Sequence, residues 1–119
     1  MTNNVYVKLK EYVESLELRR LSEFRETILK LNAIVKEVLN ELAKKYEMVV
    51  IRSWKGNDVD KDNGKYLVIE DPEVFEGLIA LNNMYHLLIR NGSRKHLKER
   101  FSKSKKAIIK LLDILINST

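Results

Sequence analysis

Residues 21–42, LSEFRETILKLNAIVKEVLNEL, decide the fold of this chain. Apolar side chains recur along them at alternating spacings of three and four residues: Leu21, Phe24, Ile28, Leu31, Val35, Val38 and Leu42. This spacing places all seven on one face of a helix, and we refer to them as the heptad seam. The pattern predicts one long helix over 21–46.

The heptad seam has two interpretations. It is either part of a core inside one chain or the contact surface of a coiled-coil dimer that associates through the 21–42 helix. Twenty-two residues is short for an independent coiled coil, and Leu29, Ile34 and Leu39 widen the apolar stripe. We therefore expect a core inside one chain, with self-association as the alternative.

Upstream, residues 5–18 predict a first helix. Its apolar face consists of Val5, Leu9, Tyr12 and Leu16, at spacings of four, three and four. The next step, to Leu21, is five residues and rotates the apolar stripe by about 140° on a helix of 3.6 residues per turn. The chain is therefore expected to turn near 19–22, with Ser22 as a candidate N-cap of the long helix.

Downstream, helix-forming residues give way to two β-branched runs, MVVIRSW (48–54) and KYLVI (65–69). Between them lies KGNDVDKDNG, which is rich in turn-forming Gly, Asn and Asp. This order predicts an antiparallel β-hairpin over 48–69 with a long loop.

Two more helices complete the chain. Asp71, Pro72 and Glu73 are typical of a helix start, and Asn91, Gly92 and Ser93 of a helix end followed by a new N-cap. We expect helices over 72–90 and 94–117, whose apolar faces carry Val74, Leu78, Leu81, Tyr85 and Leu88, and then Leu97, Phe101, Ile108, Leu111, Leu112 and Leu115. The predicted fold is α+β and mostly α: one domain, 1–119, in which an antiparallel helical bundle carries a small β-hairpin between its two helical halves.

The charge of the chain is gathered in one stretch. Residues 89–110 carry nine basic side chains and one acid, a local charge of +8, while the rest of the chain carries −3. The basic residues are Arg90, Arg94, Lys95, Lys98, Arg100, Lys103, Lys105, Lys106 and Lys110. Such a concentration indicates a polyanionic partner.

The positions of the lysines indicate how this partner would bind. Lys95, Lys103, Lys106 and Lys110 are predicted to form an outward stripe, and the single acid, Glu99, lies four residues from both Lys95 and Lys103. Lysines contact phosphates rather than bases, so we expect sequence-independent, salt-sensitive binding of RNA or single-stranded DNA. An acidic protein partner and a merely solvated face are the alternatives.

Two features near the predicted hairpin are further candidates. Arg52, Trp54 and Lys55 place the single tryptophan between two cations, which suits stacking on an unpaired base, although covering the end of the core is the more usual role of a tryptophan. Asp58, Asp60 and Asp62 alternate as in a calcium loop, but the later ligand positions do not fit. A solvated loop is the better interpretation, and we expect no metal and no cofactor.

Composition limits the class of protein. There is no Cys, so no disulfide or thiolate chemistry is available, and 45% hydrophobic with 33% charged residues is ordinary for a globular domain. The N-terminus lacks the apolar core of a signal peptide, and no apolar run is long enough to span a membrane. We expect a cytoplasmic protein, and the abundance of Lys, Glu, Ile and Leu without Gln is typical of a thermophile.

The segment from Arg90 to His96 resembles the Arg-x4-6-His motif of HEPN ribonucleases. In that family the His acts at the 2′-OH and the Arg stabilises the charge on the phosphorane. Gly92 interrupts the helix that would carry both residues, and the hairpin has no place in the minimal family. His86 is expected to be a partly buried helix residue. A catalytic ribonuclease or toxin is therefore the alternative function.

The whole chain resembles the small subunit of archaeal type I-A CRISPR interference complexes. Both combine long helices around a small β element, a basic helical face and no cysteine. This resemblance implies a non-catalytic antiviral-defence subunit, copies of which line up in a ribonucleoprotein and hold target nucleic acid. Binding of nucleic acid as an accessory subunit is therefore the function that the sequence favours.

Overall fold

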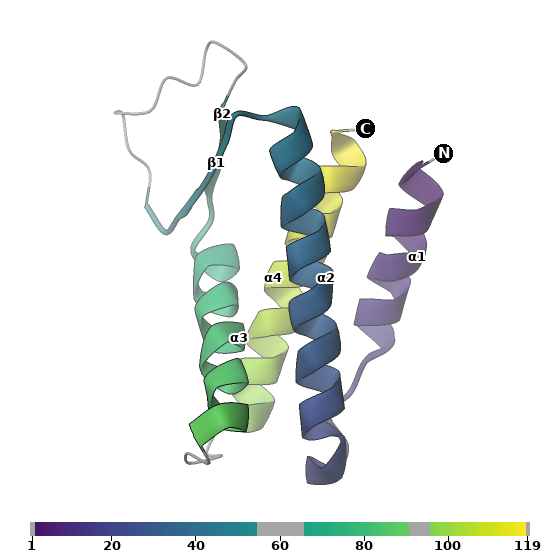
Figure 1. The fold of residues 1–119 in the computed structure, drawn as a ribbon, viewed down its shortest axis with the longest axis vertical. Coiled ribbons are helices and arrows are strands. Elements are labelled where there is room, and N and C mark those ends of the chain that lie inside the picture. Colours follow the sequence, from purple (N-terminus) through teal and green to yellow (C-terminus); the bar gives the residue numbers. More distant parts are fainter. Residues whose placement is uncertain (1, 55–65, 91–95, 119) are drawn as a thin grey trace.

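The computed structural model describes residues 2–54, 66–90 and 96–118. These residues form a helical bundle with a small sheet beside one end (Figure 1). The order along the chain is α1 (Thr2–Ser15), a 3₁₀ turn (Leu21–Glu23), α2 (Phe24–Lys45), β1 (Met48–Arg52), β2 (Tyr66–Glu70), α3 (Pro72–Arg90) and α4 (Leu97–Asn117). The mostly helical fold class is confirmed.

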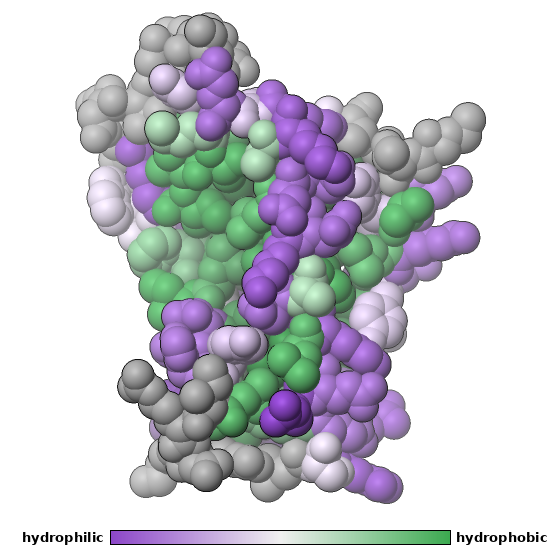
Figure 2. Space-filling model, in the orientation of Figure 1, coloured by the Kyte–Doolittle hydropathy of each residue, from purple (hydrophilic) through white to green (hydrophobic). Residues whose placement is uncertain are grey.

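The molecule is flat, with extents of 46 × 34 × 19 Å, so about two helices fit across its thickness. A thin bundle cannot enclose all of its apolar side chains. Figure 2 shows the consequence: a band of hydrophilic side chains follows α2, and apolar side chains reach the surface on both sides of it.

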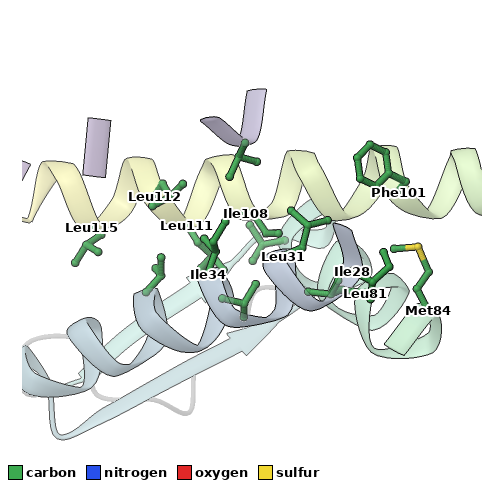
Figure 3. Packing of buried hydrophobic residues seen from close by; sticks show 14 of the residues in the cluster. Ile28, Leu31, Ile34, Leu81, Met84, Phe101, Ile108, Leu111, Leu112 and Leu115 are labelled. Atoms are coloured by element: carbon green, nitrogen blue, oxygen red, sulfur yellow. The ribbon is translucent and has the colours of Figure 1, made fainter. Parts of the chain in front are cut away.

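The six residues of the heptad seam that lie on α2, from Phe24 to Leu42, are buried within the chain. Ile28, Leu31, Val38 and Leu42 have no exposed surface, and the seam packs against α3 and α4. Figure 3 shows this core, in which side chains of the three helices meet: Ile28, Leu31 and Ile34 from α2, Leu81 and Met84 from α3, and Phe101, Ile108, Leu111, Leu112 and Leu115 from α4. Because the seam is occupied inside the chain, self-association through α2 would need another face of this helix.

The first helix, α1, turns a different face to the core than the spacing of its apolar residues predicts. Tyr6 and Val13 are buried, whereas Val5 is 63% and Tyr12 is 38% exposed. The predicted face is wrong because this short helix carries apolar side chains on several sides, and its orientation is set by α4. The Lys10 ammonium lies 2.8 Å from an Asp113 carboxylate oxygen and ties α1 to that helix.

The turn between α1 and α2 is confirmed, but its capping residue is not. The first helix ends at Ser15, and a 3₁₀ turn leads directly into α2, with the Glu23 N–H donating to the Arg20 carbonyl at 3.1 Å. Glu23, not Ser22, precedes α2, and its side chain makes no capping hydrogen bond. The 3₁₀ turn continues the helical backbone and thereby removes the extended conformation that a capping serine needs.

The two strands pair in parallel, so the predicted antiparallel hairpin is wrong. Their register runs from Met48 opposite Tyr66 to Arg52 opposite Glu70. Both strands run opposite to α2, and β2 continues directly into α3, which is also antiparallel to α2 (Figure 1). The segment 53–65 is long enough to return the chain to the start of β1, which a parallel pair requires.

The helices α3 and α4 form an antiparallel pair, as predicted. At the start of α3 the Asp71 carboxylate accepts the Glu73 N–H at 2.9 Å, which confirms Asp71 as the cap. The predicted apolar faces are buried or half-buried in both helices. At the start of α4, His96 has left-handed backbone (φ 63°) and no side-chain capping bond, while the predicted cap, Ser93, lies outside the described residues.

Gly77 allows α3 and α4 to approach closely. A Cβ at this position would lie 2.4 Å from both the Ala107 Cβ and the Lys103 carbonyl oxygen. The buried Ser104 hydroxyl donates to the Gly77 carbonyl at 3.2 Å in the same contact. The lack of a side chain at Gly77 and the small side chains of Ser104 and Ala107 thus allow these two helices to pack closely.

Gly77→Ala is expected to destabilise the protein, against the usual effect of this substitution. In a helix interior Ala is favoured over Gly by about 1 kcal/mol. Here the added methyl group meets backbone that must move, so we expect a lower melting temperature. Asn82→Ala, an exposed position on the same helix, is the control and should melt at the same or a higher temperature. A Gly77→Ala protein that melts higher than the wild type would contradict the close packing.

Candidate nucleic-acid interface

The described basic side chains of α4 point mostly outward, as predicted. Lys98, Lys103 and Lys106 are exposed, and Arg100 and Lys110 are half-buried. The side chain of Arg90, together with Arg94 and Lys95, lies outside the described residues. Exposure alone does not make a lysine available to a ligand, because the neighbouring helices bring acceptors to this face.

Lys105 holds the end of α1 instead of facing solvent. Its ammonium donates to the carbonyl oxygens of Glu14 at 3.0 Å and Leu16 at 2.7 Å, and lies 5.8 Å from the centre of the Phe101 ring. A cation at a helix C-terminus satisfies carbonyls that lack helical partners and interacts favourably with the helix dipole. Lys105 therefore has two acceptors within the chain, and its predicted contact with a phosphate stays a prediction.

Lys110 is engaged as well. Its ammonium lies 2.8 Å from an Asp71 carboxylate oxygen and 3.2 Å from a Glu73 oxygen, at the start of α3. The hydrogen bond from Lys110 holds the pKa of Asp71 below its ordinary value, and the bond to Asp71 raises the pKa of Lys110. Lys103 lies 3.6 Å from Glu99, but this pair is exposed and therefore weak.

The lowered pKa of Asp71 gives a pH dependence. The unfolded chain takes up a proton on Asp71 at a higher pH than the folded chain, so this group stabilises the fold above its ordinary pKa. The contribution is lost as the pH falls through the folded-state pKa. We expect Asp71→Asn to be less stable than the wild type at neutral pH, with the difference shrinking as the pH falls through the folded-state pKa of Asp71. Urea unfolding across this range measures it, and a constant difference would contradict the assignment.

Three α4 cations, Lys98, Arg100 and Lys106, make no ion pair with a described residue. They lie in the first half of α4, at the end of the bundle where the connection from α1 to α2 also lies (Figure 1). That connection brings Arg20 and Arg25, both exposed and likewise without an ion pair among the described residues. Sequence reasoning missed these arginines because they are about seventy residues away along the chain.

A groove of about 500 Å³ runs between the end of α1 and α4. Its apolar lining comes from both segments: Leu16, Leu18, Phe101 and Ile109. Three lysines, Lys98, Lys105 and Lys106, also line it, together with Ser102, Glu14 and Glu17. Arg19 bonds the Glu17 carboxylate at 2.8 Å and lowers its pKa, so one of the two acids is already paired. We refer to this feature as the α1–α4 groove.

A second groove, of about 440 Å³, lies between α3 and α4 and holds His96, the histidine of the alternative ribonuclease motif. His96 is exposed there, with its Nδ1 3.7 Å from a Glu99 oxygen and with Arg100 and Asn83 in the same lining. The side chain of its proposed partner, Arg90, lies outside the described residues. His86 is exposed rather than partly buried, and its ring meets that of Tyr85 edge to face.

The predicted stacking group beside β1 is not assembled. Arg52 is 7% exposed, and its guanidinium lies 3.6 Å from Glu70 on the neighbouring strand. Little of this side chain reaches the surface, which does not favour contact with a ligand, and the part of Arg52 in the site stays a prediction. Trp54 is 64% exposed, so it does not cover the end of the core either. Lys55 lies outside the described residues.

In the described parts of the chain no three His, Asp or Glu side chains converge as metal ligands, and Asp58, Asp60 and Asp62 lie outside those parts. No helix among these residues combines the length and the apolar character that crossing a bilayer demands.

Comparison with protein-family models, curated proteins and solved structures found no match to this chain.

Proposed function

We propose that this chain binds RNA or single-stranded DNA and holds the phosphates at one end of the bundle. The observation that supports this proposal is a set of cations from two separate segments that make no ion pair with described residues. They are Lys98, Arg100 and Lys106 on α4, Arg20 just before α2, and Arg25 in the first turn of α2. Cations that have no ion-pair partner among the described residues, gathered at one end of a protein of net charge +5, favour binding of a polyanion.

The chemistry of this end suits phosphate in particular. Arginine presents a planar fork of donors that matches two phosphate oxygens, and it remains charged at every physiological pH. Both α2 and α4 begin at this end, so the positive ends of two helix dipoles add to the field of the side chains. These contacts carry no base information, and binding should be independent of sequence.

The wider role in this proposal is that of an accessory subunit of a cytoplasmic ribonucleoprotein. The resemblance to the small subunit of type I-A CRISPR interference complexes supplies the context, in which several copies hold one strand. Catalysis is not needed for such a role.

Replacing Lys98 and Lys106 by Ser is expected to weaken binding and reduce its salt dependence. Each phosphate contact on a single strand contributes about 0.7 to the slope of log K against log salt, so the slope should flatten by about 1.4. Lys8→Ser with Lys36→Ser is the matched control, because it removes the same charge from exposed positions on α1 and α2. Fluorescence anisotropy with labelled oligonucleotides measures both slopes.

Three results would overturn the proposal. A wild-type protein that ignores RNA and single-stranded DNA at low salt would leave an acidic protein as the better partner. Cleavage of RNA by the wild type, lost in His96→Ala, would favour the ribonuclease alternative. Equal weakening by the Lys8 and Lys36 pair would mean that only net charge matters and that the site is not at this end.

A further inference from the structure

The α1–α4 groove is lined by both apolar and positively charged side chains. Leu16, Leu18 and Ile109 are half-buried and so present apolar surface at a hollow rather than a flat face. The exposed side chains of Lys98 and Lys106 also line the groove. Arg19 and Arg20 follow Leu18 directly in the chain. A ligand that fits must carry an apolar part and an anionic part a short distance from each other.

The walls of this groove are held in place. The Lys105 ammonium bonds the carbonyls of Glu14 and Leu16, and so fixes the end of α1 against α4. Farther along the same two helices, Lys10 and Asp113 form a second link of 2.8 Å. A hollow with clamped walls needs little reordering when a ligand enters, which favours binding.

We propose that the α1–α4 groove receives one unpaired nucleobase whose adjoining phosphates contact Lys98 and Lys106. This inference rests on the proposed nucleic-acid binding and adds the contact that selects single strands. A nucleotide has the required two-part chemistry, with a flat ring that packs on apolar side chains and a phosphate for the cations. The volume of about 500 Å³ is within the range of small-molecule sites and exceeds what one base needs. In a duplex the bases are stacked inside and cannot enter.

An oligonucleotide without bases separates this contact from phosphate binding. The probes are a single strand of about ten thymidines, a strand of the same length with abasic sugars, and a duplex of that length. We expect the abasic strand to bind the wild type roughly 5-fold or more weakly than the thymidine strand, since removing the apolar surface of one ring from water contributes at least this much. The slope against salt should be the same for both single strands, because the phosphates are unchanged.

A variant places the effect in the groove. Leu18→Ser removes apolar surface from the lining and should lower affinity for the thymidine strand toward that of the abasic strand, without changing the affinity for the abasic strand. Leu29→Ser, at an apolar side chain of α2 that is 41% exposed and away from the groove, is the matched control and should change neither affinity.

The outcomes separate this inference from the proposed function. Equal binding of thymidine and abasic strands by the wild type overturns the base site but leaves phosphate binding intact. No binding of any probe at low salt overturns the proposed function itself. Duplex binding as strong as single-strand binding also overturns the base site. Binding of anionic lipid vesicles that Leu18→Ser abolishes, without binding of oligonucleotides, would assign the groove to a lipid instead.

Discussion

Leu31→Asp is expected to leave no folded protein. Leu31 lies in the middle of the heptad seam, where α2 meets α3 and α4, and it has no exposed surface. A carboxylate at this position would have neither water nor a cation beside it, and burial of such a group costs several kcal/mol or forces the carboxyl to stay protonated. Small domains are stable by only about 5–15 kcal/mol. The packing of the leucine side chain is lost as well, which lowers the stability further.

The control for this substitution is two residues away. Leu29→Asp introduces the same charge on the same helix at a side chain that is 41% exposed, so the protein should remain folded. Circular dichroism with thermal melting measures both proteins. A Leu31→Asp protein that melts cooperatively near the wild-type temperature would show that the heptad seam is not the core of the fold.

Arg52→Met is expected to be the second most damaging change. Arg52 and Glu70 are directly opposite in the register of the two strands, with side chains 8% and 9% exposed and charged groups 3.6 Å apart. Removing one member of a buried ion pair takes from the other charge the partner on the opposite strand and typically costs about 3–5 kcal/mol. Urea unfolding measures this loss.

The double variant tests the cause of the loss. Arg52→Met with Glu70→Leu removes both charges, and replacing a buried pair by apolar side chains is often neutral or stabilising. The double variant should therefore recover most of the stability that Arg52→Met loses. If the two losses simply add, Arg52 stabilises the sheet through packing of its long side chain and not through Glu70.

Much of the fold follows from local patterns. The spacing of the heptad seam and the Asp71 cap each depend on residues within a few positions, and local geometry determines which of them share a helix face. The face of α1 did not follow, because Val5 and Tyr12 are as apolar as Tyr6 and Val13 and only packing against the neighbouring helices selects between them. The direction of β2 relative to β1 did not follow from local patterns either. It depends on the position of α3, into which β2 continues.

The sequence by itself determined which segments form helices, which faces of α2, α3 and α4 form the core, and that the positive charge is gathered near the start of the last helix. Only the tertiary structure decided which of these cations are available. Lys110 is engaged by Asp71, 39 residues away, and Lys105 by the Glu14 carbonyl, 91 residues away. Helix periodicity acts over three or four residues and contains no information about such partners. The same packing brings Leu18 beside Lys98 and so creates a groove that neither segment contains alone.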